Sequence, residues 1–481
     1  MRDPDLPSTS QRQSERRNVA GFLFLFCAII IYMKGRIYIK NLAENVGQEV
    51  TIAGWVDVRR DQGKMVFFDM RDMTGKVQCV ALPSRLEVIE KAKEFRSEWV
   101  LKITGLVNKR PEKNMKAGVL NGDVELEVTG IEVLAKAEPL PFDMSMDGYN
   151  LDLTTELDNR SLVLRQPKVQ AVFKVQETII DSFRVFLRKN DFFGVQAPAI
   201  TPATAEGGAE VFQVNYFDKK AFLTQSPQLY KQIVMSAFER CFSVNKVFRA
   251  EPSSTTRHLT EIVSLDAEMA FIDSWTDVRD MAEETVKYIL KQVELKNGEH
   301  LKVLNATIPV MIDKTPTLSL REVQQKIFEK FGRDVRGEKD TNPQDEREIC
   351  EIIKEETGSD FVFIYGYPTR KKPFYVYPDE NEPEYNQGMD LLCRGVEWLS
   401  GGRRINDYEQ LMKHVEIWKM DPAKVKMFLE AFKYGVPPEG GFAFGAERMT
   451  MQLLGLKNVR EASMFPRDMN RIDEKLNSDG Y

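Results

Sequence analysis

Residues 248–271, FRAEPSSTTRHLTEIVSLDAEMAF, constrain the fold of this chain more than any other segment. Two runs of alternating polar and apolar residues flank a polar loop, and this alternation predicts a strand, a loop and a second strand. Arg249 stands before the loop, and Arg257 and His258 stand near its end. A solvated charged hairpin would show the same pattern, so this segment alone fits either a surface loop or a binding site.

A glycine-rich segment near the end of the chain favours a binding site. Residues 441–453, GFAFGAERMTMQL, predict a turn that runs into a helix, with Glu447 and Arg448 in its first turn. Arginines on a strand, beside a loop and at a helix start suit an extended polyphosphate, because guanidinium groups bind phosphate oxygens directly. The sequence contains no GxGxxG motif and no phosphate-binding loop of the GxxxxGK type. Together the two segments predict a polyphosphate site of another kind.

The two segments resemble motifs 2 and 3 of the class II aminoacyl-tRNA synthetases. A helix expected from about Pro167 to Asn190, followed by DFFGVQAPAI, resembles motif 1, which implies Pro198 at a dimer interface. The resemblance extends from Lys34 to the end of the chain, and the aspartyl enzymes of the shorter, archaeal and eukaryotic type fit best. It implies an α+β fold in which an antiparallel sheet flanked by helices follows an N-terminal OB-fold barrel. It also implies a homodimer.

The N-terminal part of the chain reads as a small barrel. Residues 34–138 contain five short runs with strand character, separated by turn signals such as Thr74-Gly75 and Asn121-Gly122. A helical stretch near Leu86–Phe95 falls between the third and fourth runs. This pattern predicts a five-stranded OB barrel, the anticodon-binding domain of the resembling enzymes.

The remaining segments complete the expected organisation. A linker is expected over 139–160, where two prolines begin it, and a catalytic domain over 161–481. Charged residues of mixed pattern at about 300–385 indicate a helical insertion. Residues 1–33 contain an apolar run too short to span a bilayer comfortably. We interpret them as an extension upstream of the normal start at Met33, with a membrane anchor as the alternative and no stable membrane association expected.

Composition narrows the class of protein. A net charge of −6 excludes a histone-like polycation, but it leaves room for a nucleic-acid partner through local basic patches. The five cysteines are odd in number and widely spaced, which favours a reduced, cytoplasmic protein over a disulfide framework. With only three histidines and no Cys/His cluster, a zinc site is not expected.

The resemblance assigns the nucleotide chemistry. It implies ATP contacts from Arg249, Ala250, Glu251, Arg257, His258, Leu259, Glu397, Gly445, Ala446, Glu447 and Arg448. Arg249, on the α-phosphate, and Arg448, stacked on adenine, would be the catalytic residues. Glu397 and Ser400 would bind Mg²⁺, which prefers hard oxygen ligands together with phosphates; a structural salt bridge is the alternative for Glu397. The family usually has glycine where Ala443 stands, and the extra methyl group could crowd the adenine pocket.

The resemblance also implies an aspartate site. Its residues would be Glu206, Gln228, Lys231, Arg249, Asp266, Ser400 and Arg404. Gln228 and Lys231 are one helical turn apart, and Lys231 and Arg404 would converge on the substrate's side-chain carboxylate. A buried pair of cations requires an anion, because an amide would leave their charge uncompensated. An ordinary surface lysine is the alternative for Lys231. Glu206, beside two glycines, would lie on a mobile lid.

The barrel would bind RNA. OB folds stack bases on aromatic residues of one sheet face. The resemblance implies a stacking role for Phe67, base contacts from Gln78 and Glu125, and a backbone or base contact from Arg59. Core burial is the alternative for Phe67, in which case Phe68 would take the opposite face by strand alternation.

These observations predict an aspartate–tRNA ligase with ATP, L-aspartate and tRNA(Asp) as substrates, and with tRNA(Asn) as a second candidate. An asparaginyl enzyme is the nearest alternative, and Lys231 argues against it. A non-catalytic paralogue acting as a binding protein is a further alternative, which the motif arginines Arg249, Arg257 and Arg448 disfavour.

Overall fold

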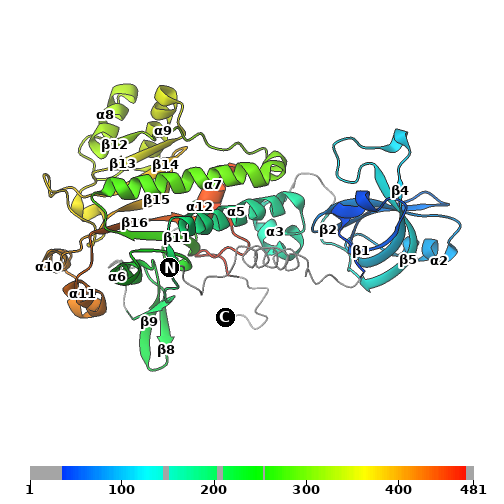
Figure 1. Cartoon of the computed structure of the whole chain (residues 1–481), viewed down its shortest axis with the longest axis horizontal. Coiled ribbons are helices and arrows are strands. Elements are labelled where there is room, and N and C mark those ends of the chain that lie inside the picture. Colours follow the sequence, from blue (N-terminus) through cyan, green and yellow to red (C-terminus); the bar gives the residue numbers. More distant parts are fainter. Residues whose placement is uncertain (1–34, 145–150, 203–209, 253–254, 473–481) are drawn as a thin grey trace, which may run out of the picture. The chain divides into compact units, whose positions relative to one another are not determined.

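The structure, a computed structural model, describes residues 35–144, 151–202, 210–252 and 255–472 (Figure 1). The chain divides into two compact units between residues 149 and 150. Residues 1–33 and the question of their role lie outside the described ranges. No helix in those ranges combines the length and apolar composition that crossing a membrane requires.

The first unit is a closed five-stranded barrel, as predicted. Its strands pair in the order β1-β2-β3-β5-β4, and a helix, α2, connects β3 to β4 (Figure 1). The bounds are β1 (Glu49–Asp61), β2 (Val66–Asp72), β3 (Gly75–Ala81), α2 (Leu86–Glu94), β4 (Val100–Lys109) and β5 (Val124–Ala135), with short 3-10 turns η1 (Ile39–Asn45) and η2 (Glu112–Asn114).

Strand alternation builds the core of the barrel. On β2, Val66, Phe68 and Met70 are fully buried, whereas Phe67 and Asp69 are half-buried on the outer face. Phe68 packs edge-on against Phe95, with ring centroids 4.9 Å apart. Alternate side chains of a strand point to opposite faces, so the outer face of β2 is free to carry polar and aromatic groups.

An eight-stranded sheet forms the centre of the second unit, as the resemblance implied. Its order is β12-β13-β14-β15-β16-β11-β10-β6, antiparallel except for the two outermost pairs. The strands are β6 (Phe193–Gly194), β10 (Arg240–Phe248), β11 (Glu261–Ala270), β12 (Thr317–Ser319), β13 (Phe361–Tyr365), β14 (Gly388–Cys393), β15 (Val396–Arg403) and β16 (Glu439–Gly445).

Two long helices, α5 (Pro167–Lys189) and α7 (Trp275–Leu304), lie side by side along one face of this sheet (Figure 1). Their apolar residues, among them Ile179, Phe183 and Ile289, pack with Leu265 of β11 and Phe442 of β16 in the main core. Burying this face leaves the opposite face of the sheet for polar side chains.

The remaining elements complete the second unit. They include a small sheet in the order β7-β9-β8, with β7 (Ile200–Thr201), β8 (Gln213–Tyr216) and β9 (Lys219–Leu223). The other helices are α3 (Leu153–Asp158), α4 (Arg160–Val163), α6 (Gln228–Phe238), α8 (Leu320–Phe331), α9 (Pro343–Thr357), α10 (Tyr408–Ile417), α11 (Lys426–Lys433) and α12 (Ala446–Leu454). The short turns are η3 (Thr369–Lys371), η4 (Pro422–Val425) and η5 (Val459–Ala462).

The structure differs from the expected content of two segments, the insertion and the linker. The expected insertion at 300–385 contains helices α8 and α9, but it also supplies β12 and β13 to the main sheet, so it is not purely helical. Its strands are only three and five residues long, too short to give a recognisable alternation. The expected linker, 139–160, already contains α3. Asp152 caps the start of this helix, because the Asp152 side chain accepts a hydrogen bond from the Thr155 amide.

Candidate active site

A cavity of about 270 Å³ brings the two charged segments of the sequence together. Four neighbouring strands of the main sheet, β10, β11, β16 and β15, contribute to it, and α12 begins at its edge. Most of the predicted residues line it: Gln228, Arg249, Glu251, Arg257, His258, Leu259, Glu397, Ser400, Arg404, Gly445, Glu447 and Arg448. Ala250, Ala446, Lys231 and Asp266 are not lining residues, and Glu206 lies outside the described residues.

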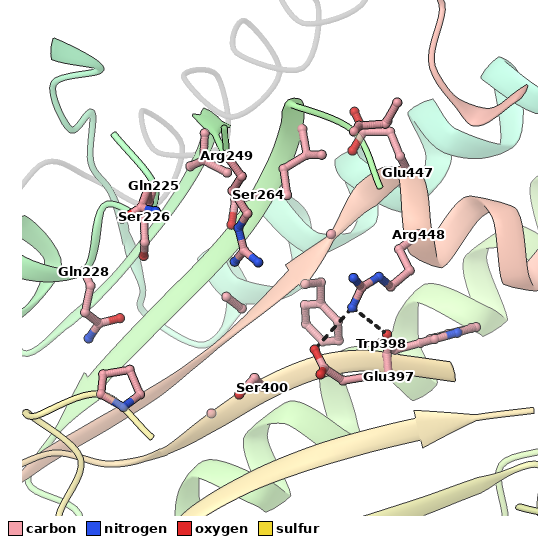
Figure 2. A pocket seen from close by; sticks show the side chains of 18 of the residues that line it. Gln225, Ser226, Gln228, Arg249, Ser264, Glu397, Trp398, Ser400, Glu447 and Arg448 are labelled. Atoms are coloured by element: carbon pink, nitrogen blue, oxygen red, sulfur yellow. Dashed lines mark hydrogen bonds and ion pairs between the residues drawn. The ribbon is translucent and has the colours of Figure 1, made fainter. Parts of the chain in front are cut away.

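Arginine side chains reach into the cavity from two sides. Figure 2 shows the guanidinium groups of Arg249, which follows β10, and Arg448, on α12, pointing into the same space. Arg249 Nη1 lies 3.7 Å from Glu251 Oε1, and His258 Nε2 lies 3.5 Å from the other oxygen of Glu251. Arg448 Nη1 lies 3.4 Å from Glu397 Oε1. These contacts hold the arginines in place while leaving them partly exposed to a ligand.

A carboxylate that sequence reasoning missed joins this group. Arg257 Nη1 lies 3.3 Å from Oε2 of Glu346, at the start of α9. Burial, followed by the charge of Glu397, raises the pKa of Glu346 to about 7. Glu447 behaves similarly: burial raises its pKa to about 7 although it accepts from the Val263 amide at 3.0 Å.

Oxygen ligands gather on the β14–β15 side of the cavity. Glu397 and Ser400 of β15 line it, and Asp390 of β14 pairs with Lys372, whose Nζ also lies 3.4 Å from Ser400 Oγ. Burial, followed by the charge of Asp390, raises the pKa of Glu397. No cluster of three or more His, Cys, Asp or Glu residues among those described could hold an ion. The carboxylate of Glu397 and the hydroxyl of Ser400 are hard oxygen donors of the kind that Mg²⁺ binds together with phosphates and water.

A network of buried charges lies beneath the cavity. Lys231, on α6, is 1% exposed, and its Nζ lies 2.9 Å from Asp266 Oδ1 and 3.2 Å from Glu268 Oε2. Arg404 Nε lies 2.8 Å from Glu268 Oε1, so both cations bind the same carboxylate. Gln228 Nε2 donates to Glu268 at 3.4 Å. Although burial opposes ionisation, Arg404 and Lys231 lower the pKa of Glu268, which is thus ionised.

This network corrects the expectation for Lys231 and Arg404. Both cations lie at the Glu268 carboxylate, and the surface-lysine alternative for Lys231 is wrong. Their convergence on a substrate carboxylate stays a prediction. They are not uncompensated, however, because Glu268 lies between them and Asp266 adds a second negative charge. A signal for Glu268 was present in the sequence: it stands two residues after Asp266 on one strand, and such positions share a face.

A glycine makes room for this carboxylate. Gly441 of β16 pairs with Glu268 of β11, and a Cβ at this position would lie 2.3 Å from Glu268 Oε2 and 2.2 Å from the Ala267 carbonyl oxygen. Ala443, two residues later on the same face, lines the cavity with its methyl group. The departure from glycine at 443 therefore narrows the cavity.

We expect Gly441→Ala to weaken the site. The added methyl group would push Glu268 off Lys231 or Arg404, and overpacking of this kind costs about 1–3 kcal/mol. Urea unfolding measures the loss of stability, and Gly298→Ala is the matched control, because no heavy atom lies within 4 Å of a Cβ built there. Equal stability of the two variants would contradict the close approach.

One outer face of the barrel carries most of the predicted RNA contacts. Phe67 of β2 is half-buried there, and Gln78 Nε2 of β3 donates to Glu125 Oε2 of β5 at 3.1 Å. Asp69 pairs with Gln78 across the sheet and belongs to the same face. The face thus combines an aromatic ring with hydrogen-bonding groups, as base stacking and base reading require.

The structure separates Arg59 from this face. Arg59 Nη1 donates to the carbonyls of Ala92 and Lys93 at the end of α2. Arg60, its neighbour, has Nη2 3.2 Å from Asp69 Oδ1 and pairs with Phe67 across the sheet. A register shift between Val56 and Val58 decides which arginine faces outward. The contact expected of Arg59 therefore suits Arg60, which sequence reasoning missed.

Comparisons with known proteins agree with both units. The family described as "tRNA synthetases class II (D, K and N)" matches residues 152–469, and the "OB-fold nucleic acid binding domain" matches residues 50–134. The Aspartate–tRNA(Asp/Asn) ligase of Deinococcus radiodurans is 40% identical over 443 residues, which cover 91% of this chain and 98% of that protein. The Aspartate–tRNA(Asp) ligase of Pyrococcus abyssi is 36% identical over 440 residues, 90% of this chain and 98% of that protein.

A solved structure shows the same fold. The crystal structure of asparaginyl-tRNA synthetase from Pyrococcus horikoshii complexed with asparaginyl-adenylate superposes with a TM-score of 0.82 at 31% identity, over 91% of this chain and 99% of that one. Because a family match covers more than half of the chain and relatives above 30% identity cover nearly all of it, this chain belongs to the class II tRNA synthetases of the D, K and N group.

Proposed function

We propose that the protein is an aspartate–tRNA ligase, which activates L-aspartate with ATP and transfers it to the 3′ end of tRNA(Asp). The observation that carries this proposal is the convergence of two buried cations, Lys231 and Arg404, on one carboxylate directly beneath the cavity. A site that already binds the Glu268 carboxylate in this way is built for the carboxylate of an acidic substrate side chain. The relatives named as aspartate–tRNA ligases support the same reading.

Asparaginyl activity is the second candidate, because an asparaginyl enzyme shares the fold. An asparagine amide would bring an NH₂ donor toward Lys231 and Arg404, which are themselves donors only. That mismatch makes the acidic side chain the better ligand. A non-catalytic role is disfavoured, since Arg249, Arg257 and Arg448 all line the cavity.

The first chemical step joins the two substrates. A carboxylate oxygen of aspartate attacks the α-phosphorus of ATP, and the bond to the departing pyrophosphate breaks. Arg249 would bind the α-phosphate, Arg257 the terminal phosphates and Arg448 the adenine, so that fixed positive charge meets the charge of the transition state. Mg²⁺ at Glu397 and Ser400 would neutralise phosphate charge when bound.

The second step uses the RNA. The 3′-terminal ribose hydroxyl of tRNA attacks the aspartyl carbonyl, and AMP leaves with the bonding electron pair. Phe67, Gln78 and Glu125 on the barrel face would hold the anticodon, and Arg60 would add a cation. We also propose a homodimer and a reducing, cytoplasmic location, in keeping with the buried free thiols of Cys79, Cys241, Cys350 and Cys393.

Two assays test this function. Aspartate should support Mg²⁺-dependent exchange of pyrophosphate into ATP without tRNA, and asparagine should not. Aspartylation of tRNA(Asp) and tRNA(Asn) transcripts then determines whether one or both are substrates. Equal exchange with asparagine would overturn the assignment.

Replacing Phe67 should affect only the RNA step. Phe67→Ala removes one stacking surface, worth about 1–3 kcal/mol, so aminoacylation efficiency should fall by about 5- to 150-fold while pyrophosphate exchange stays normal. Phe67→Tyr, which keeps the ring on the half-buried outer face, should remain near wild type. An equal loss in both assays would identify Phe67 as a structural residue.

A further inference from the structure

A third carboxyl group lies on the face that carries the specificity network. Glu439 is the first residue of β16 and pairs with Ala270 of β11. Two residues later on β16, Gly441 pairs with Glu268. Because alternate strand positions share a face, Glu439 and Glu268 face the same side of the sheet. Glu439 is fully buried, as is Glu268. It does not line the cavity, so it belongs to a second layer beneath it.

The buried network contains three carboxyl groups but only two cations. Lys231 and Arg404 supply two positive charges, and Asp266 and Glu268 take both in ion pairs of 3.2 Å or less. None of the ion pairs formed by described residues includes Glu439. Its Oε1 accepts one hydrogen bond, from Gln232 Nε2 at 2.8 Å, and its Oε2 has no partner among the described residues. A buried carboxylate with a neutral amide as its side-chain partner is strongly disfavoured.

We propose that Glu439 is held as a neutral acid and that its proton determines the affinity of this site for an anionic substrate side chain. This inference rests on the proposed function, which it deepens. With Glu439 neutral, two cations balance two anions, and a substrate carboxylate can compete with Glu268 for Lys231 and Arg404. With Glu439 ionised, the same pocket carries a surplus negative charge that repels an aspartate side chain and leaves a neutral side chain unaffected.

The surroundings agree with this assignment. Burial, followed by the charge of Glu268, raises the pKa of Glu439 well above its ordinary value. The other groups that face the network are Asp266 on β11, Lys231 on α6, Arg404 after β15 and Cys241 on β10. Burial raises the pKa of the Cys241 thiol, and the two cations are fixed in ion pairs. Glu439 is thus the carboxyl group of this network that can gain or lose a proton without breaking an ion pair formed by the described residues.

The network also gives a route from Glu439 to the cavity. Gln232 Oε1 accepts from Gln228 Nε2 at 3.1 Å, and Gln228, one helical turn earlier on α6, lines the cavity and donates to Glu268. The Arg404 amide donates to the Glu439 carbonyl oxygen at 2.8 Å. Glu439 therefore acts through Gln228, Glu268 and Arg404 as a specificity-determining residue without touching the substrate.

Glu439→Gln tests the kinetic consequence, because an amide mimics the neutral acid. Its KM for aspartate in pyrophosphate exchange should stay within about threefold of wild type at neutral pH. As pH rises through the range in which Glu439 loses its proton, the wild-type KM should rise by about tenfold for each unit by which bound aspartate raises the pKa of Glu439, whereas the variant should show no such rise. The KM for ATP and the kcat should depend on pH in the same way in wild type and in Glu439→Gln. Glu439→Met, which is also neutral, should likewise show no rise of KM with pH, although it removes the acceptor of the Gln232 hydrogen bond.

Glu283→Gln is the matched control, since Glu283 is a buried carboxyl on α7 that accepts from Thr315 and does not line the cavity. It should keep the wild-type dependence of KM on pH. Superimposable profiles of wild type and Glu439→Gln would overturn the proposal. So would a loss of aspartate efficiency above a hundredfold in a folded Glu439→Gln at neutral pH, because an ionised carboxylate would then be required.

A measurement without substrate separates this inference from the proposed function. An acid whose pKa is raised on folding keeps a proton that the unfolded chain releases above about pH 4.5, so wild-type stability falls as pH rises from there to the folded pKa. The Tm of Glu439→Gln relative to wild type should be lowest near pH 4.5 and should increase toward pH 8. A constant difference would contradict the neutral acid. Absence of aspartate-dependent exchange in wild type would overturn the function and the specificity role, while the Tm series would still decide the protonation.

Discussion

Arg249→Ala should lose about 10²- to 10³-fold in aspartate-dependent pyrophosphate exchange. In the structure, the Arg249 guanidinium points into the cavity opposite Arg448, and its nearest ionic contact is a loose one, 3.7 Å from Glu251 (Figure 2). It is therefore available to a ligand, and a donor aimed at charge that develops in the transition state is worth about 3–4 kcal/mol. The loss should appear mainly in kcat, because the proposed contact of Arg249 with the α-phosphate would strengthen as the bond to pyrophosphate breaks.

Lys246→Ala, on β10 three residues before Arg249, is the matched control. Its side chain is about half exposed, and it pairs with Glu261 at 3.1 Å without lining the cavity. Removing such a surface pair should cost about 1 kcal/mol of stability at most and leave exchange unchanged. If Arg249→Ala kept normal kcat with a higher KM for ATP, Arg249 would bind the ground state only.

Lys231→Met should damage both stability and activity. The change leaves Asp266 without its lysine partner and Glu268 with Arg404 alone, in a region from which water is excluded. Removing one partner of a buried ion pair costs about 3–5 kcal/mol, which urea unfolding will measure. Aspartate efficiency should fall by about two to three and a half decades, because the variant lacks the cation proposed to hold the substrate carboxylate. The KM for ATP should change little.

A double variant separates the two effects. Lys231→Met combined with Asp266→Asn removes one positive and one negative charge and should recover part of the stability, because replacing a whole buried pair is far less costly than breaking it. Aspartate efficiency should stay low. Recovery of activity along with stability would mean that Lys231 supports the fold and does not bind substrate.

Local patterns predicted the parts of the protein that depend on local geometry. The alternation around Phe67 and Phe68 placed one ring outside and one inside, and the three-residue spacing from Gln228 placed Lys231 beside it on a single face of α6. The barrel followed from such patterns, and the class of the catalytic sheet followed from the resemblance that the two motifs carry. Such features can be predicted from neighbouring residues alone, without knowing which distant residues they contact.

The failures share a cause in long-range geometry. A register shift in β1 determines that Arg60, and not Arg59, lies on the face that carries Phe67. No residue pattern in the sequence predicts such a shift. Glu346 reaches the site from α9, 89 residues after its partner Arg257, so nothing in its own neighbourhood points to phosphate chemistry. Glu268 was within reach of strand alternation, but its position between two cations depends on strands and a helix far apart in sequence.

Two strands that pair in the main sheet, β11 and β16, lie far apart in the sequence, so one is synthesised long before its partner. β11 ends at Ala270, yet its partner β16 begins only at Glu439, so the ribosome makes more than a third of the chain before the two can pair. Until then one edge of β11 lacks its neighbour, and Glu268 lacks Arg404. The barrel strands all lie between Glu49 and Ala135 and can close early. Because distant pairings form slowly and exposed strand edges aggregate, the catalytic unit is more exposed to aggregation during synthesis than the barrel.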